Sequence, residues 1–256
     1  NFDEVYVDRT ASRYAPLKFW LIGGMDRARA NCNHFIAQVL KRNNTPKVLV
    51  IGSGTTGVGA EALWHHSAIE VHGVDIYASD TVDVICDAHY LPLESGFYDG
   101  VWIQAVLEHV VEPQLVVAEI TRVLACDGVV YAETPFMQQV HEGAYDFTRF
   151  TVLGHRYLFR DFKAIDFGGL NGPGLVMSWA ARYLAWSIFR SRNIGRLVGA
   201  GVGVLMRPFA FLESRKSLFD ASSAVYFLGE KTSAKRLSHK ELVGLYEGQF
   251  GSNKGE

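Results

Sequence analysis

Short apolar runs alternate with amphipathic stretches along most of this chain. Each run has the length of a buried strand and is bounded by residues that favour turns, whereas the stretches between them repeat apolar residues every three or four positions, as helices do. We expect strands at residues 48–51, in a run that ends at Asp75, and at residues 84–87, 100–103, 129–132, 162–167 and 223–230. This order of elements predicts an α/β fold.

Three helices can be placed by their end signals. Asp26 stands where an N-cap residue would begin a helix that runs to about Arg42. Pro113 suits the first turn of a second helix, and Gly128 is expected to end it. Ser238 is placed to cap a short helix near the C-terminal end of the chain.

A glycine turn separates the first expected strand from the helix-like segment after it. Gly52, Gly54 and Gly57 have the spacing GxGxxG, and Asp75 ends the next strand 23 residues after Gly52. Glycines let the backbone approach a ligand closely, and an acid at this place accepts hydrogen bonds from ribose hydroxyls. The pattern fits a dinucleotide site or an S-adenosylmethionine site, and a strand–turn–helix unit that binds nothing has the same spacing.

Two later motifs narrow this choice. Residues 87–92 read DAHYLP, and residues 107–110 read LEHV after an apolar strand. With the glycine turn, these motifs resemble class I S-adenosylmethionine-dependent methyltransferases, particularly the broad family with DAxxLP and LEHV signatures. The resemblance covers residues 45–165. It implies a Rossmann-like, seven-stranded, mostly parallel sheet with helices on both faces and an antiparallel strand at its edge.

The resemblance also assigns a role to residues around the cofactor. The glycine turn would line the methionine part, Asp75 would hold the ribose, Asp87 would take the adenine amine, and Gln104 would close the pocket. The full set of expected cofactor-binding residues is Gly52, Ser53, Gly54, Thr55, Asp75, Ile76, Asp87, Ala88, Gln104 and Ala105. The chain departs from the family at Val50, where an acid is common, and at Gly57, which comes one position later than usual.

The acceptor side is expected beyond the strand at residues 129–132, because ligands of open α/β sheets bind outside the carboxyl ends of the strands. Residues 134–151 are similar to the TPF…HxxPxDFxRFT segment of methyltransferases that accompany bacterial surface-polysaccharide synthesis, with Ala144 in place of the usual proline. His141 is the candidate general base, since an imidazole can take a hydroxyl proton near neutral pH. Asp146 and Arg149 would orient it or grip a polar acceptor.

Each of these three residues also has a structural interpretation. Asp146 can cap the helix that follows, Arg149 can pair with Asp146, and His141 can bind the acceptor or serve only in packing. His109 has a lining role or a packing role next to the expected cofactor pocket. No His, Cys and carboxylate set has metal-ligand spacing along the chain, so we expect no metal.

An apolar and basic insertion separates the last two expected strands. Its apolar segments, residues 175–189 and 194–212, are too short or too interrupted by arginine to span a bilayer comfortably. Seven basic residues and one acid lie in this region: Arg182, Arg190, Arg192, Arg196, Arg207, Glu213, Arg215 and Lys216. The insertion therefore predicts peripheral contact with an anionic membrane, or a lid or homodimer interface. Gly199, Gly201 and Gly203 would let the two helices pack closely.

Composition and charge bear on the size of the core, on nucleic-acid binding and on cellular location. With 256 residues and 48% hydrophobic content the chain can bury a large core, and its net charge of −2 gives no reason to expect nucleic acid. Its three cysteines are widely separated, which favours the reducing cytoplasm, and no segment resembles a signal peptide. We expect a cytoplasmic protein, located at the periphery of the membrane if the insertion binds lipid.

These expectations combine into one methyltransferase domain. Its parts are an N-terminal lid and helix (1–44, with the aromatic lid at 14–20), a cofactor-binding core (45–167), an inserted helical subdomain (168–220), the last strand (221–232) and a polar helix and tail (233–256). The resemblance implies O-methylation of a sugar hydroxyl on a surface polysaccharide or its lipid-linked precursor. The alternatives are a lipid or quinone-like acceptor, and a cofactor-binding partner of a glycosyltransferase without turnover.

Overall fold

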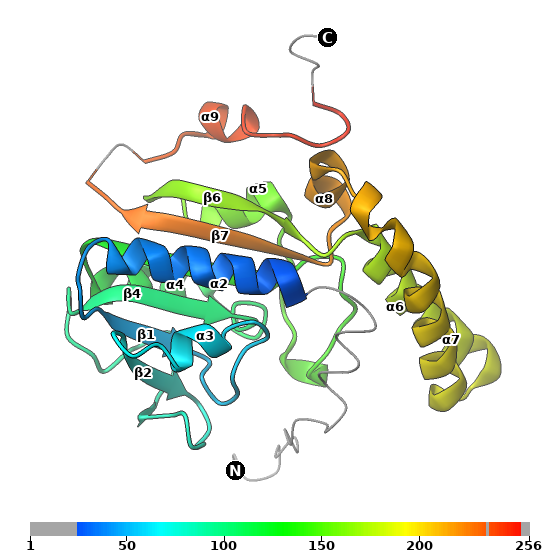
Figure 1. Cartoon of the computed structure of the whole chain (residues 1–256), viewed down its shortest axis with the longest axis horizontal. Helices are drawn as coiled ribbons and strands as arrows, with labels where there is room; N and C mark the ends of the chain where they lie inside the picture. Colours follow the sequence, from blue (N-terminus) through cyan, green and yellow to red (C-terminus); the bar gives the residue numbers. More distant parts are fainter. Residues whose placement is uncertain (1–24, 234–235, 252–256) are drawn as a thin grey trace.

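The computed structural model describes residues 25–233 and 236–251. They form one seven-stranded sheet with the strand order β3-β2-β1-β4-β5-β7-β6 (Figure 1). The strands are β1 (Lys47–Ile51), β2 (Glu70–Asp75), β3 (Val84–Ile85), β4 (Tyr98–Gln104), β5 (Leu124–Pro135), β6 (Phe162–Leu170) and β7 (Ala224–Lys231). The lid expected at residues 14–20 and the tail at 252–256 lie outside the described residues.

The sheet is parallel except for one strand. Strands β1 to β5 pair in parallel, whereas β7 is antiparallel to both β5 and β6, between which it lies. The chain moves from β1 outward to β3 and then returns to place β4 on the other side of β1. This reversal leaves a crevice at the carboxyl ends of β1 and β4, where ligands of such sheets bind. The predicted fold class is confirmed.

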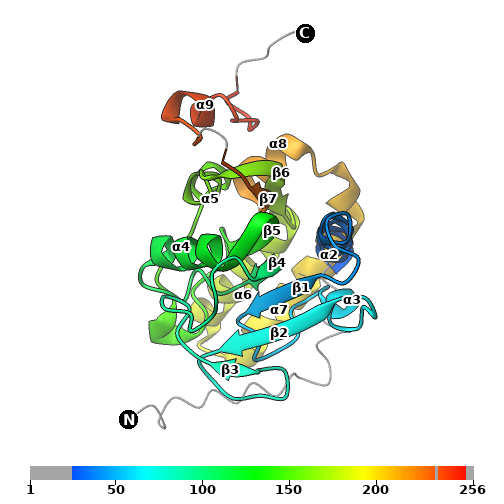
Figure 2. The ribbon, with the colours of Figure 1, turned by 90° about the vertical axis from the view of Figure 1, so that its left-hand side faces the viewer.

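Helices cover both faces of the sheet (Figure 2). The regular helices are α2 (Met25–Leu40), α3 (Glu61–Trp64), α4 (Pro113–Val123), α5 (Val152–Leu158), α6 (Pro173–Phe189), α7 (Arg192–Met206), α8 (Arg215–Ala221) and α9 (His239–Val243), and two short 3₁₀ segments are η2 (Gly143–Tyr145) and η3 (Arg207–Leu212). Helices α2 and α3 lie on one face, and α4 and α5 on the other.

The central strands supply the two halves of the core with alternate residues. Val48 and Val50 of β1 point to the face covered by α2, where the Phe35 and Trp102 rings meet edge to face at 5.4 Å. Leu49 and the residues that alternate with it pack under α4 instead. Because both faces are buried, the strand reads as a continuous apolar run, as expected for a central parallel strand. Burial of each such side chain contributes about 2 kcal/mol.

Helices α6 and α7 form an antiparallel pair inserted between β6 and β7. They project from the end of the sheet and leave one side of the pair away from the domain (Figure 1). Their mutual contact is built on small residues: Gly195, Gly199 and Gly203 of α7 are buried. Ser178 of α6 donates its hydroxyl to the Gly199 carbonyl at 2.7 Å. Gly201, expected among the packing glycines, faces open space.

Several element ends differ from the sequence expectation. Helix α4 stops at Val123 because Leu124 already has extended backbone angles and begins β5, so Gly128 does not end the helix. The helix after the glycine turn is a single turn, α3. Asp26 lies within α2 rather than before it. Ser238 caps α9 as expected, in a capping box with Glu241.

Candidate active site

The glycine turn at the end of β1 is shaped by two close contacts. Gly52 has φ +79°, and a Cβ there would lie 2.2 Å from the Val106 side chain in the loop after β4. The backbone N–H groups of Gly52 and Ser53 both donate to the Val74 carbonyl of β2, at 2.9 and 3.1 Å. These hydrogen bonds hold the turn at the reversal point of the sheet. Because of its positive φ and the nearby Val106 side chain, only glycine fits the first position of the turn.

Asp75, at the end of β2, faces this turn. Its carboxylate is largely buried and accepts hydrogen bonds from the N–H groups of Gly54 (2.8 Å) and Tyr77 (3.2 Å), one on each oxygen. A carboxylate oxygen has two lone pairs, so each oxygen retains capacity for a ribose hydroxyl. Ile76 beside it is 59% exposed, which leaves an apolar side chain uncovered at the mouth of the crevice.

Asp87 and Ala88 lie on the next strand end along the sheet. The Cys86 N–H donates to the Asp75 carbonyl at 2.9 Å, so the residues after β3 start beside the end of β2. Partial burial works against ionisation of Asp87, but hydrogen bonds from the backbone and imidazole of His89 hold its pKa below the ordinary value. An ionised acceptor at this place suits an exocyclic amine.

Gln104 and Ala105 lie where β4 ends. Gln104 donates from Nε2 to the Val58 carbonyl (3.1 Å) and to Glu133 (3.3 Å), which ties the glycine loop to the end of β5. Its Oε1 is buried without a partner among the described residues. Ala105 has φ +54°, an unusual conformation for a residue other than glycine.

A buried polar chain continues from Gln104, and the sequence analysis did not find it. Tyr131 donates its hydroxyl to Glu133 at 2.9 Å and accepts from the Asn31 side chain of α2 at 3.2 Å. Burial raises the pKa of Glu133 to about 7, against the hydrogen bonds from Tyr131 and Gln104. The only sequence signal was an acid and a tyrosine inside an apolar strand.

The residues at the crevice fit S-adenosylmethionine, with one change in detail. The glycine turn provides a surface with little side-chain bulk, Asp75 provides free lone pairs, and Ile76 provides an apolar contact for a base. Thr55 is exposed on the same loop. The Ser53 side chain, however, is fully buried toward Gly73 of β2, so this residue lines the turn through its backbone.

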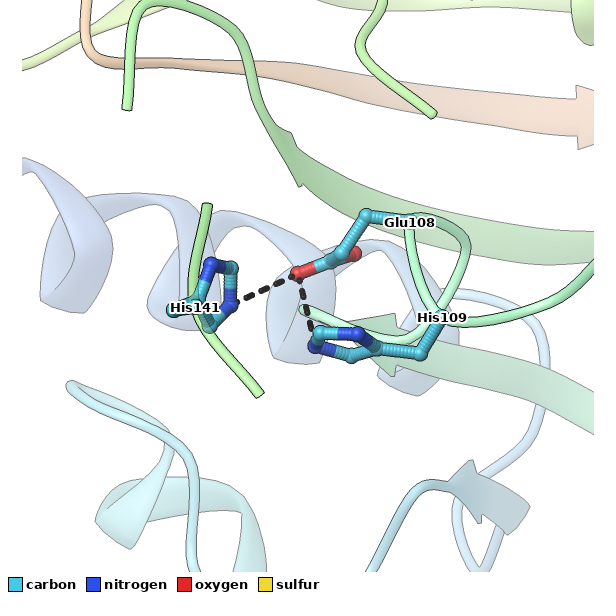
Figure 3. A group of neighbouring side chains, drawn as sticks. All are labelled: Glu108, His109 and His141. Atoms are coloured by element: carbon cyan, nitrogen blue, oxygen red, sulfur yellow. Dashed lines mark ion pairs between the residues drawn. The ribbon is translucent and has the colours of Figure 1, made fainter. Parts of the chain in front are cut away.

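A second group of side chains lies on the acceptor side (Figure 3). Glu108 and His109 come from the loop after β4, and His141 comes from the segment after β5. The Nε2 atoms of both histidines lie 3.6 Å from Oε1 of Glu108, and the two rings meet edge to face at 4.9 Å. The Glu108 side chain is completely buried. Glu108 was not among the predicted site residues, although it belongs to the LEHV motif.

His141 is further linked to the other two predicted acceptor-side residues. The backbone N–H of His141 donates to Asp146 Oδ2 at 2.8 Å, and the ring Nδ1 lies 3.3 Å from the same oxygen. The Glu108 carboxylate raises the pKa of His141 above its ordinary value, partial burial works the other way, and Asp146 adds to the rise. Asp146 therefore both positions His141 and favours its protonated form.

Arg149 pairs with Asp146 through two guanidinium nitrogens, as one of the structural interpretations predicted. It also donates to the carbonyls of Gln138, Gln139 and Thr148, so it holds the segment after β5 in place. Burial alone would raise the pKa of Asp146, but the bonds from Arg149 and His141 lower it to about 2. Asp146 does not cap α5; Thr151 does, accepting from the Gly154 N–H at 3.1 Å.

A hollow of about 560 Å³ opens beside this group. It is lined by Gln138, Gln139, Val140, Asp146, Phe147, Thr148, Arg149 and Tyr183. Tyr183 belongs to α6, so the inserted helix pair forms one wall. The hollow thus combines amide, guanidinium and aromatic groups next to the His141–Asp146 pair.

Comparisons with known proteins agree with this geometry. Residues 49–132 match the model of a family described as the methyltransferase domain, which spans the glycine turn, Asp75, Asp87 and the Glu108–His109 loop. No curated protein matches the chain.

Solved structures show the same fold at low identity. A S-adenosylmethionine-dependent methyltransferase from Archaeoglobus fulgidus is 18% identical, with a TM-score of 0.53 over 86% of this chain and 100% of that one. A putative sarcosine dimethylglycine methyltransferase from Galdieria sulphuraria is 15% identical, with a TM-score of 0.52 over 80% and 86%. Phosphoethanolamine N-methyltransferase 2 of Haemonchus contortus, solved with S-adenosylhomocysteine, is 15% identical, with a TM-score of 0.50 over 91% and 61%.

The fold and the crevice define a class: a Rossmann-like enzyme that binds a nucleoside at the reversal point of its sheet. Within this class, residues 49–132 match the methyltransferase domain, and the crevice fits S-adenosylmethionine as the methyl donor.

Proposed function

We propose that this enzyme methylates a hydroxyl group of a sugar, on a surface polysaccharide or its lipid-linked precursor. The observation that carries the proposal is the hollow beside His141. The side-chain amides of Gln138 and Gln139 can hydrogen-bond several hydroxyls, and the Tyr183 ring offers a flat apolar surface. Sugars present both kinds of surface, which supports a glycan acceptor over a wholly apolar one.

The reaction needs a group that takes a proton. S-adenosylmethionine supplies a methyl group on a sulfonium, and transfer to a hydroxyl oxygen leaves S-adenosylhomocysteine and releases one proton. His141 is placed to accept that proton, because its ring is partly exposed and its partner Asp146 lines the hollow. Asp146, held by Arg149, orients the ring, and Glu108 favours the protonated imidazole that results.

The inserted helices support an acceptor that is attached to a lipid. Because α7 packs on α6 through glycines, the large apolar side chains of the pair point outward instead of into the domain. Those exposed include Met177, Leu184, Trp186, Ile188, Phe189, Ile194, Leu197, Val204, Leu205, Phe209, Phe211 and Leu212. Arg190, Arg192, Arg196 and Arg207 are exposed among them. We propose that this apolar and basic surface, which we call the hairpin surface, lies on an anionic membrane at its cytoplasmic side.

One helical stretch among the described residues, Arg192–Leu212, is long and apolar enough to cross a membrane by length and composition. Arg196 and Arg207 leave only ten uncharged residues between them, fewer than the ~20 that a spanning helix requires. If the helix lies in the plane of the membrane surface, both arginines can reach the lipid headgroups. In a spanning helix they would enter the hydrocarbon region.

A transfer assay with labelled methyl groups tests the proposed acceptor. The enzyme would be given S-adenosylmethionine carrying a labelled methyl and, separately, soluble glycans, polyprenyl-linked oligosaccharides and a quinone-containing lipid extract. We expect label in alkali-stable methyl ethers of sugar residues, reduced at least tenfold by His141→Asn and unchanged by His65→Gln at the exposed residue that follows α3. Label found only in lipid without sugar would show that the acceptor is a lipid and not a glycan. If the protein bound the cofactor but no fraction became labelled, the result would favour a non-catalytic partner of a glycosyltransferase.

A further inference from the structure

We propose that Glu108, His109 and His141 bind a divalent cation of the first transition series. One carboxylate oxygen and two imidazole Nε2 atoms converge on one point, with the oxygen 3.6 Å from each nitrogen and all three atoms within 4.8 Å of one another (Figure 3). The residues come from two loops that only the fold brings together.

Glu108 is the first reason to expect a cation at this point. Its side chain is completely buried, and neither carboxylate oxygen has a hydrogen-bond partner among the described residues. A buried carboxylate without a hydrogen bond is strongly unfavourable, and its ion-pair contacts with His109 and His141 are long at 3.6 Å. A bound cation satisfies this group.

The outer partners of the two histidines are the second reason. The His109 Nδ1 lies 2.7 Å from the Tyr145 carbonyl, which can only accept, so Nδ1 carries the proton and the neutral ring has a free lone pair at Nε2. The His141 Nδ1 lies 3.3 Å from Asp146 Oδ2, which is an ion-pair contact and not a hydrogen bond. Both Nε2 atoms lie 3.6 Å from the same Glu108 oxygen. Metal-binding histidines are commonly oriented by such a carbonyl or carboxylate on the second nitrogen.

The separations are longer than those of a hydrogen-bonded cluster and close to those between two ligands of one cation. A nitrogen and a carboxylate oxygen that share a proton lie about 2.7–3.2 Å apart, which is closer than the 3.6 Å seen for both pairs. Two ligands about 2.1 Å from one tetrahedral cation lie roughly 3.4 Å apart.

The ligand types indicate which cations fit. Two imidazoles with one carboxylate suit Zn²⁺, Co²⁺, Mn²⁺ or Fe²⁺, whereas Ca²⁺ and Mg²⁺ prefer oxygen ligands. The histidine side chains are 21% and 30% exposed, so at least one coordination position remains open toward solvent. An open position is typical of catalytic rather than structural sites.

The role of the cation rests on the proposed function. A hydroxyl oxygen of the acceptor in the open position would have a lowered pKa, and its proton would leave to water as the new C–O bond forms. In the cation-bound enzyme His141 would be a ligand and water would take the proton that His141 accepts in the enzyme without the cation. The binding site itself requires no particular acceptor.

Titration of the full chain with Co²⁺ alone tests the site. After treatment with EDTA and buffer exchange, we expect one Co²⁺ per chain, visible d–d absorption typical of nitrogen and oxygen ligands, and displacement by Zn²⁺. Glu108→Gln and His109→Ala should each weaken binding at least tenfold. His65→Gln removes an exposed histidine and should leave it unchanged. S-adenosylhomocysteine binding by each variant shows that it is folded.

Two results would overturn the site, a third would overturn the role of the cation, and a fourth concerns the acceptor alone. Absence of bound Co²⁺ in the folded wild type removes the site, and equal binding by Glu108→Gln assigns the cation to other histidines. Methyl transfer at the same rate with and without the cation would remove its role in activating the hydroxyl while the site stands. Failure to methylate any glycan, with Co²⁺ still bound, would contradict the proposed acceptor alone.

Discussion

The carboxylate of Asp75 accepts a hydrogen bond from the Gly54 N–H at 2.8 Å, which joins the end of β2 to the glycine turn after β1. One side chain therefore shapes the turn and offers lone pairs to the cofactor. A Cβ at Gly54 would lie 2.8 Å from the same oxygen, so the two residues are complementary.

Removal of this carboxylate should weaken cofactor binding. In Asp75→Ala the ribose hydroxyls and the Gly54 N–H both lose their acceptor, and hydrogen bonds to a charged group contribute about 1.5–3 kcal/mol each. We expect S-adenosylhomocysteine affinity to fall at least tenfold in a calorimetric titration. Asp80→Ala removes an exposed acid nearby and should bind as the wild type does. Wild-type affinity in Asp75→Ala would exclude the assigned role.

The pKa of Glu133 predicts a pH dependence of stability. Its folded-state pKa of about 7 lies above the ordinary value of 4.5, so the folded state binds the proton more tightly than the unfolded state. This stabilisation is complete below pH 4.5 and is lost as the pH rises to 7, by up to about 3 kcal/mol. Glu133→Gln should therefore raise the free energy of unfolding at pH 8 relative to the wild type.

Urea denaturation at pH 5 and pH 8 measures this effect. The difference between Glu133→Gln and wild type should be larger at pH 8 than at pH 5. Glu94→Gln removes an exposed carboxylate and serves as the control for the change in net charge. An equal difference at both pH values would show that Glu133 does not titrate in this range.

The glycines of α7 should respond to alanine in opposite directions. A Cβ at Gly199 would lie 2.8 Å from Arg182 Cβ and 3.1 Å from the Ser178 carbonyl, so Gly199→Ala should force α6 and α7 apart. Such overpacking costs about 1–3 kcal/mol, more than the ~1 kcal/mol gained in helix propensity. Gly201→Ala faces open space and should stabilise the helix. Urea denaturation of both variants gives the comparison, and destabilisation by Gly201→Ala would contradict this packing.

The hairpin surface should bind anionic vesicles through its arginines. Vesicles of phosphatidylglycerol and phosphatidylethanolamine should sediment the protein, whereas phosphatidylcholine vesicles should bind it weakly. Replacing Arg190, Arg192 and Arg196 together by glutamine should weaken binding at least tenfold, because each arginine near such a surface contributes about 1 kcal/mol. Lys41→Gln, on an exposed residue far along the chain, is the control.

Two further results would contradict an interfacial position. Protein that resists extraction by alkaline carbonate would indicate that Arg192–Leu212 spans the bilayer. A dimer in solution that does not bind vesicles would assign the hairpin surface to a second copy of the chain.

The sequence by itself determined the features that depend on neighbouring residues. The glycine turn, the acid at the end of the next strand and the N-cap at Ser238 are local patterns with local causes, and each is present in the structure. Buried central strands must be apolar on both faces, so the strands of the sheet could also be found. The motif at residues 107–110 marked the loop after β4 but did not show what it faces.

Only the tertiary structure decided which distant residues meet. Glu108 and His141 lie on different loops, and their approach depends on the pairing of β4 with β5. The inward face of α7 was set by the backbone of α6, which is why Gly195 packs and Gly201 does not. Burial of Glu133 likewise depends on α2 covering the sheet. Contacts between elements are determined by how their surfaces fit together, and the spacing of residues along a chain does not record that fit.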